Sequence, residues 1–196
     1  TELIDRHGKD AMAVDAVGKL PGFAPSKPKE GFDTIPMWVA DMNFPTAKSI
    51  QEAIIKRAQH PLFGYFQPSD AYYQAIIDWH KKRKGVSGLT KEDIGYENGV
   101  LGGVVSALKV FAAPGDKVLL HSPTYMGFTN AVLSNGYQIV HSPLIKDENG
   151  TWRMNYEDMD KKIKKNQIHV AIFCNPHNPT GRVWTKEEIT KVMEVY

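Results

Sequence analysis

The stretch FCNPHNPTGRVW, residues 173–184, decides the fold predicted for this chain. It follows an apolar run, residues 170–173, that is short and β-branched enough to be a buried strand. It precedes residues 185–188, TKEE, which have the spacing of the capping box that begins a helix. Two Asn-Pro pairs and a glycine restrict the connecting loop to few conformations. In open α/β sheets ligands bind beside loops that follow strand ends, so we expect a site here.

Upstream of this loop the chain alternates between strand and helix patterns. Alternation of this kind predicts an α/β fold of three αβα layers with a mostly parallel sheet. The expected strands span residues 94–97, 117–121, 137–140 and 168–173, and the expected helices span residues 104–111, 125–134, 155–165 and 185–196.

The first third of the chain has weaker patterns. Residues 1–36 are rich in Gly, Pro, Lys and Asp and are interpreted as an arm and loop. A helix is predicted after residue 45, with four apolar residues buried at helical spacing, and another over residues 70–84, which ends at Gly85. The buried set of the first helix is Ile50, Ala53, Ile54 and Ala58, and the apolar stripe of the second is Tyr73, Ile76, Ile77 and His80.

A glycine-rich turn, residues 98–103, enters the helix predicted at 104–111. Exposed backbone amides at the positive end of a helix suit a phosphate group. The spacing is neither Gly-x-Gly-x-x-Gly nor a Walker loop, so adjacent glycines that only allow close helix packing are the alternative.

Composition excludes several classes of function. The chain has 196 residues and a formal net charge of +2 with both signs mixed, which gives no indication of nucleic acid as a partner. Its single cysteine, Cys174, fits a reducing compartment, and no apolar run is long enough for a membrane span. We expect a soluble cytoplasmic protein. Seven scattered histidines without HExxH or paired cysteines argue against a metal site, and the lack of Gly-x-Ser-x-Gly argues against a serine hydrolase.

Three segments carry a resemblance to a known family. The motif NPHNPTG at 175–181 resembles the signature loop of fold-type I pyridoxal-phosphate (PLP) enzymes, the aminotransferase class I/II superfamily. Segments 38–42 (WVADM), 60–65 (HPLFGY) and 176–184 (PHNPTGRVW) are similar to the cystathionine β-lyase and C-S lyase subgroup, often called MalY/PatB. The likeness runs in register from about Asp33 to the end.

The resemblance implies roles for six residues. Backbone amides of Val100 and Leu101 would hold the phosphate of pyridoxal 5'-phosphate, and Tyr125 would stack on its ring. Asn178 would bind the phenolic oxygen, and Tyr65 would reach the phosphate of the other subunit in a homodimer with shared active sites. The substrate would contact Ala40, Tyr125 and Asn178. Core packing is the alternative for both tyrosines, and an ordinary turn residue is the alternative for Asn178.

The resemblance also implies domain limits. Residues 1–45 would be an N-terminal arm and small-domain segment, and residues 46–196 the first part of the PLP-binding large domain. The rest of that domain and the C-terminal small domain would be absent. The family's Schiff-base lysine, pyridinium aspartate and carboxylate-binding arginine would lie beyond residue 196, so no catalytic residue is assigned here. Asn43, Ala47 and Met126 replace residues common in the subgroup, which weakens expectations about nearby side chains.

The function implied is that of a PLP-dependent C-S β-lyase. Such an enzyme performs α,β-elimination on L-cysteine conjugates and releases a thiol, pyruvate and ammonia. A PLP-dependent aminotransferase is the first alternative, because transamination shares the first half of the path. A truncated, non-catalytic module with the same fold is the second.

Overall fold

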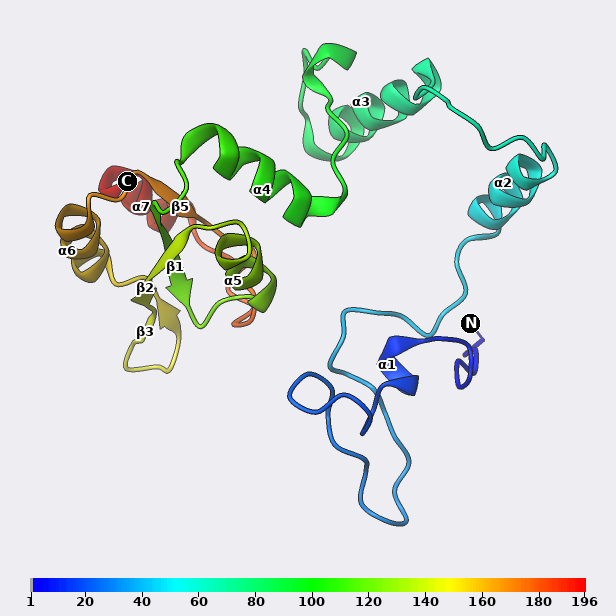
Figure 1. Cartoon of the computed structure of the whole chain (residues 1–196), viewed down its shortest axis with the longest axis horizontal. Coiled ribbons are helices and arrows are strands. Elements are labelled where there is room, and N and C mark those ends of the chain that lie inside the picture. The colour runs from blue at the N-terminus through cyan, green and yellow to red at the C-terminus, as the bar shows by residue number, and fades with distance from the viewer. Residues whose placement is uncertain (1) are drawn as a thin grey trace. The chain divides into compact units, whose positions relative to one another are not determined.

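The computed structural model describes residues 2–196 and divides into two compact units (Figure 1). The N-terminal unit extends to Ser69, and the C-terminal unit spans Asp70–Tyr196. This division by contacts does not test the domain limit expected after residue 45, which stays a prediction.

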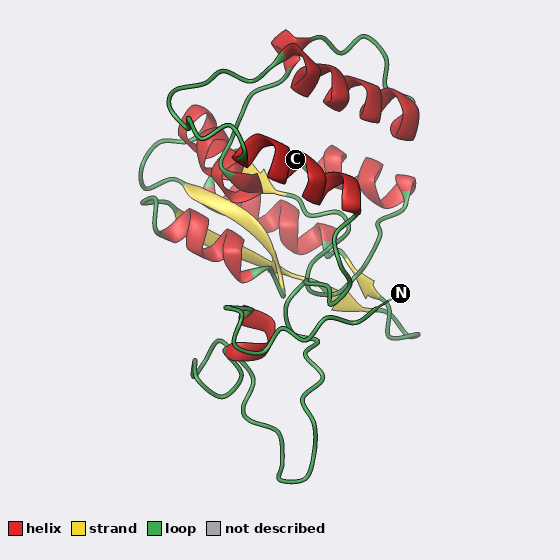
Figure 2. Cartoon of the chain, turned by 90° about the vertical axis from the view of Figure 1, so that its right-hand side faces the viewer, coloured by secondary structure: helices red, strands yellow, loops and turns green. Residues whose placement is uncertain are grey.

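The N-terminal unit is mostly loop, drawn green in Figure 2, with two helices, α1 (Met12–Asp15) and α2 (Lys48–Ala58). Its segment 38–43 is anchored on the first residues of the chain. The Trp38 indole donates a hydrogen bond to the Ala13 carbonyl at 3.0 Å, and Asp41 pairs with Arg6 at 2.7 Å. These contacts fix the backbone on either side of Ala40, which is itself exposed.

The helix expected after residue 45 is confirmed as α2, but the expected burial is wrong. None of its residues is buried, and Ile50 and Ile54 are 53% and 64% exposed. The apolar spacing predicts the helix and its apolar face. Burial of that face also requires another part of the protein to pack against it. An open groove of about 540 Å³ lies along α2 instead.

The C-terminal unit confirms the α/β class. It contains, in chain order, α3 (Asp70–Lys84), η1 (Lys91–Asp93), α4 (Gly99–Phe111), β1 (Lys117–Ser122), α5 (Met126–Leu133), β2 (Gln138–Pro143), β3 (Ile145–Lys146), β4 (Trp152–Arg153), α6 (Tyr156–Asn166), β5 (Val170–Ile172) and α7 (Lys186–Val195). A parallel sheet has the order β2-β1-β5, with Leu120 opposite His141 and Ile172. β3 and β4 form an antiparallel hairpin.

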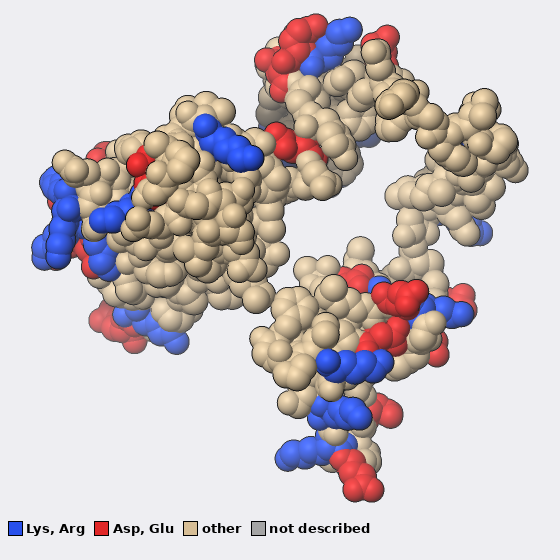
Figure 3. All heavy atoms as spheres, viewed as in Figure 1, with Lys and Arg blue, Asp and Glu red and all other residues tan. Residues whose placement is uncertain are grey.

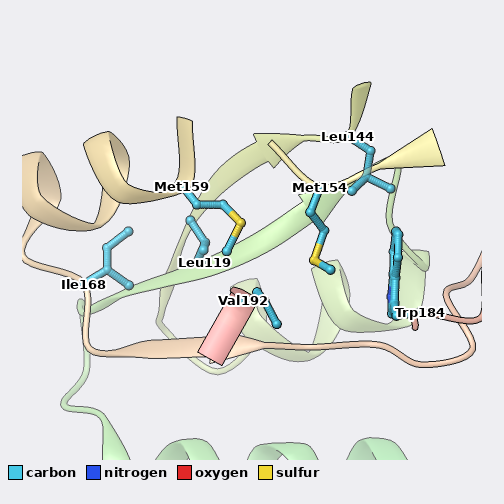
Figure 4. Packing of buried hydrophobic residues seen from close by; sticks show 7 residues of the cluster. All are labelled: Leu119, Leu144, Met154, Met159, Ile168, Trp184 and Val192. Carbon is cyan, nitrogen blue, oxygen red and sulfur yellow. The ribbon is translucent and has the colours of Figure 1, made fainter. Parts of the chain in front are cut away.

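The central strand β1 carries the core on both of its faces. Val118 and Leu119 are fully buried, and because they are adjacent in a strand their side chains point to opposite faces. Leu119 packs with Met159 of α6 and Val192 of α7 (Figure 4). Val118 packs with Leu108 of α4 and Val132 of α5. Helices therefore cover both faces of the sheet, which is the predicted three-layer arrangement.

Local signals in the sequence set the boundaries of several helices. Asn155 caps α6 by accepting from the Asp158 amide, and the Thr185–Glu188 capping box begins α7, as predicted. Gly85 follows α3 with φ of +67°, a conformation that glycine adopts without steric cost. Within residues 2–196, no helix is both long enough and apolar enough to cross a bilayer.

The strand expected at residues 94–97 is wrong. These residues pair with no strand in the described part of the chain, and the sheet consists of β2, β1 and β5. Helix α4 also begins earlier than expected, at Gly99. The glycines of the 98–103 turn therefore belong to the first turns of the helix.

Candidate functional site

The 173–184 stretch forms a tight turn at the carboxyl end of β5. The amide of His177 donates to the Arg182 carbonyl, and the Gly181 amide donates to the His177 carbonyl, both at 2.7 Å. Gly181 has φ of +72°, which favours glycine at this position. Asn178 lies on the exposed side of this turn, and its side chain makes no hydrogen bond to any of residues 2–196.

Trp184 anchors the two ends of the turn to each other. Its indole nitrogen donates to the Cys174 carbonyl at 3.0 Å, and its backbone amide donates to Asn175 Oδ1 at 3.2 Å. The side chain is 4% exposed and belongs to the core shared with α6 and α7. The turn is therefore continuous with the hydrophobic core.

His177 faces inward from the same turn. It is 3% exposed, its Nδ1 lies 2.9 Å from the Thr180 hydroxyl, and its ring meets the Trp184 ring edge at 5.7 Å. Burial lowers the pKa of His177, while a hydrogen bond with the His121 backbone opposes this shift. His177 is thus neutral at physiological pH.

A second buried imidazole, His121, is the residue before the last in the central strand β1. Its Nε2 lies 2.8 Å from the Tyr196 hydroxyl, and its Nδ1 has no partner among the described residues. Burial, helped by the nearby His177, lowers the pKa of His121 to about 4. Burial also raises the pKa of the Tyr196 phenol, so this group is uncharged at neutral pH.

Sequence reasoning missed both histidines. One signal for His121 was available in the sequence. His121 is a polar residue that directly follows the apolar residues Val118–Leu120 of the predicted strand. His177 was inside the motif, but Asn178 was the residue to which the resemblance gave a role.

An ion-pair network holds the far end of the turn. Arg182 contacts both oxygens of Glu188 at 2.7 and 2.6 Å, and Arg153 contacts one of them at 2.9 Å. Arg153 also contacts Asp147 in the β3–β4 turn at 2.9 Å. Burial raises the pKa of Glu188, but hydrogen bonds from the Thr185 amide and the two guanidinium groups outweigh it and leave the pKa below its usual range.

Leu101 and Tyr125 are brought together between α4 and α5. Tyr125 is the N-cap of α5, and its ring lies so close to Gly127 that a Cβ added there would overlap it. The same Cβ would lie 3.0 Å from Leu101 Cδ1. Phe128 meets the Tyr125 ring edge-on at 5.4 Å, and 39% of Tyr125 remains exposed. Part of the Tyr125 side chain, which is predicted to stack on the cofactor ring, is therefore accessible to a ligand.

The amides of Val100 and Leu101 lie in the first turn of α4. The first four amides of an α-helix have no partner within it, and Asn98 provides no side-chain cap here. The Val100 side chain is 80% exposed. The two amides are thus available to a hydrogen-bond acceptor, as their predicted role in holding a phosphate requires.

The other three predicted residues lie elsewhere in the chain. Asn178 and Tyr125 belong to loops that follow the neighbouring strands β5 and β1. Tyr65 is fully exposed, and it and Ala40 belong to the N-terminal unit. The cofactor and substrate roles of all six residues stay predictions.

Charge and metal-ligand patterns point to no other site. On the face drawn in Figure 3, basic and acidic groups are interspersed. Three lysines of α6 pair with carboxylates one turn away, as a solvated helix face does. In the part of the chain that the structure describes, no three His, Cys, Asp or Glu residues are grouped as a metal ion would require.

Comparison with known proteins decides the family. The family model for aminotransferase class I and II matches residues 34–196. The chain belongs to the aminotransferase class I and II family. Within this family it is 34% identical to the cystathionine β-lyase PatB of Bacillus subtilis, over 97% of this chain and 47% of that protein. It is 28% identical to MalY of Escherichia coli, over 96% and 46%.

Solved structures agree with the family assignment. The PLP-bound C-S lyase of Staphylococcus hominis is 34% identical, with a TM-score of 0.79 over 99% of this chain and 46% of that one. Cystalysin of Treponema denticola, which contains PLP, is 27% identical, with a TM-score of 0.83 over 100% and 48%. The chain spans about half the length of the relatives it matches.

Proposed function

We propose that this chain forms the cofactor-orienting part of a PLP-dependent C-S β-lyase that acts on L-cysteine conjugates. The observation that carries the proposal is the likeness to the Staphylococcus hominis C-S lyase, which extends over 99% of the chain. Likeness to PatB over 97% of the chain supports the same activity.

The residues present fit a phosphorylated aromatic ring. The uncapped first turn of α4 offers two amides to a phosphate, and a helix N-terminus favours its negative charge. Tyr125 offers a partly exposed ring face beside Leu101, and Asn178 offers an amide with no other partner. PLP, when bound, supplies an electron sink for carbanion chemistry, and the protein supplies its orientation.

In this proposal each residue has one task. The α4 amides hold the phosphate, Tyr125 fixes the plane of the ring, and Asn178 donates to the phenolic oxygen. Ala40 would line the substrate pocket. No lysine of this chain occupies the family's Schiff-base motif, so proton transfer at the substrate Cα is assigned to a lysine outside residues 1–196.

We further propose a homodimer in the cytoplasm. The fully exposed ring of Tyr65 is free to reach the cofactor phosphate of a second subunit. The unpaired Cys174 fits a reducing compartment.

An aminotransferase is the second candidate. The glutamate-pyruvate aminotransferase AlaA of Escherichia coli is 33% identical over 67% of this chain. The likeness to the C-S lyases covers more of the chain, and for this reason we place the lyase first. A non-catalytic module with this fold is the third candidate.

Cofactor binding and product analysis test the proposal. The longest natural form of the chain is titrated with PLP, followed by borohydride trapping and mass spectrometry. We expect a visible absorption band, a trapped adduct on lysine, and pyruvate release from L-cystathionine. Amino transfer to a 2-oxo acid without release of a thiol would instead establish the aminotransferase. A failure to trap any adduct would leave only the non-catalytic module.

Replacing Asn178 with alanine tests its assigned role. Loss of a hydrogen bond to a charged oxygen should lower turnover about tenfold or more and shift the pH titration of the visible band. The free energy of unfolding should change by less than about 0.5 kcal/mol, because the side chain has no partner in the fold. Asn149→Ala, in the β3–β4 turn, is the matched control. An unchanged band titration for Asn178→Ala would remove Asn178 from the site.

A further inference from the structure

The Asn178 side chain is placed by the backbone of its turn and has no hydrogen bond of its own within residues 2–196 to fix it. The preceding residue, His177, is by contrast 3% exposed. A side chain that binds a ligand in a defined orientation must be held in place by its surroundings. Where it has no side-chain partner, the contacts that fix its backbone have this function.

Thr180 and His177 hold that backbone from inside the turn. The Thr180 hydroxyl lies 2.9 Å from His177 Nδ1 and 3.5 Å from the Arg182 amide, which donates to it. Two backbone hydrogen bonds, both with His177, close the same turn. The Thr180 hydroxyl therefore joins both sides of the turn that displays Asn178.

The His177 ring also connects this turn to the next strand. It packs on Trp184, and it interacts with the backbone of His121 at the end of β1. The tautomer of His177 decides whether Nδ1 donates to the Thr180 hydroxyl or accepts from it. Four residues after His121 comes Tyr125, the other residue assigned to the ring of the cofactor.

We propose that Thr180 and His177 are positioning residues for Asn178, and that they align its amide with the turn that carries Tyr125. The proposal rests on the proposed function. The Thr180 hydroxyl links His177 with Arg182 across the turn. This turn follows β5, which is the neighbour of the strand β1 that precedes Tyr125.

Thr180→Val and Thr180→Ser test this proposal as a matched pair in the longest natural form of the chain. Valine keeps the shape and removes the hydroxyl, whereas serine keeps the hydroxyl. Thr180→Val should weaken PLP binding about three- to tenfold, the scale of one hydrogen bond. It should also shift the titration of the visible band in the same direction as Asn178→Ala. Thr180→Ser should restore the parent's titration.

The double variant separates positioning from simple stabilisation. If Thr180 acts through Asn178, Thr180→Val should cause no further shift of the band titration in an Asn178→Ala background. Additive shifts, or lower thermal stability with the parent's titration, would refute the proposal.

A readout without cofactor keeps the two proposals distinguishable. In the PLP-free protein, Thr180→Val should shift the imidazole ¹⁵Nδ1 signal of His177, because it removes the hydroxyl that contacts Nδ1. Lack of a PLP band in the parent would refute the proposed function. An Nδ1 signal that is the same in the parent and Thr180→Val would refute the hydrogen bond on which this inference depends.

Discussion

Glu188→Gln should lower the free energy of unfolding by about 2 kcal/mol at neutral pH. Its carboxylate accepts from Arg182 and from Arg153, and the side chains of Glu188 and Arg182 are only 13% and 20% exposed. A neutral amide at residue 188 would leave the positive charges of Arg182 and Arg153 close together without the carboxylate that compensates them, at a site that is only partly hydrated. The estimate lies between the 3–5 kcal/mol typical of a broken buried pair and the 0–1 kcal/mol typical of a surface pair.

The capping function of residue 188 should survive this change, since glutamine also serves at the third helical position of a capping box. The loss is therefore expected from charge pairing rather than from helix initiation. Glu157→Gln provides the control, because Glu157 also lies in the first turn of a helix but pairs with Lys161 in an exposed setting. We expect it to cost less than about 0.5 kcal/mol.

The pH dependence checks the cause. The pKa of Glu188 is lowered in the folded protein, so its contribution is present above its unfolded pKa and is lost as the pH falls through the folded pKa. The difference between parent and Glu188→Gln should thus shrink in acid. Equal denaturation midpoints for Glu188→Gln and Glu157→Gln at neutral pH would contradict the proposed network.

The fold could be predicted from sequence where local signals and burial agree. The capping box at Thr185 and the apolar run at residues 117–121 each specified an element, a helix and a strand respectively. The same reasoning failed at residues 94–97, because a strand needs a pairing partner, which a short local pattern does not specify, and these residues join neither edge of the sheet. It also failed for the burial of α2, since periodicity specifies a face and leaves open what covers it.

The candidate site divides in the same way. Free amides near the glycine-rich turn could be predicted because a helix start leaves its amides without partners. The resemblance, however, was needed to name Val100 and Leu101, because the helix was expected to begin only at residue 104. The approach of both Leu101 and Tyr125 to Gly127 depends on how α4 packs on α5, which no local pattern specifies. The histidine pair needed the strand order, since His121 and His177 are 56 positions apart and meet only because β1 and β5 are neighbours.

The buried His121 makes the protein sensitive to mild acid. Its folded pKa is about 4, and an unfolded histidine titrates near about 6.5. Between these values the unfolded state binds a proton that the folded state excludes, so stability falls as the pH falls. A shift of this size corresponds to about 3 kcal/mol lost between about pH 6.5 and pH 4.

His121→Gln should flatten the stability profile in that window, because an amide does not titrate and can still bond to the Tyr196 hydroxyl. The groups that face His121 are His177 from the β5 loop and Tyr196 from the end of α7. The lowered pKa of His177 acts in the same direction, and Tyr196 stays protonated throughout, so part of the slope should remain. Urea denaturation at several pH values measures the profile, with His141→Gln as the control for loss of an exposed imidazole. A profile for His121→Gln as steep as the parent's would show that another group causes the acid sensitivity.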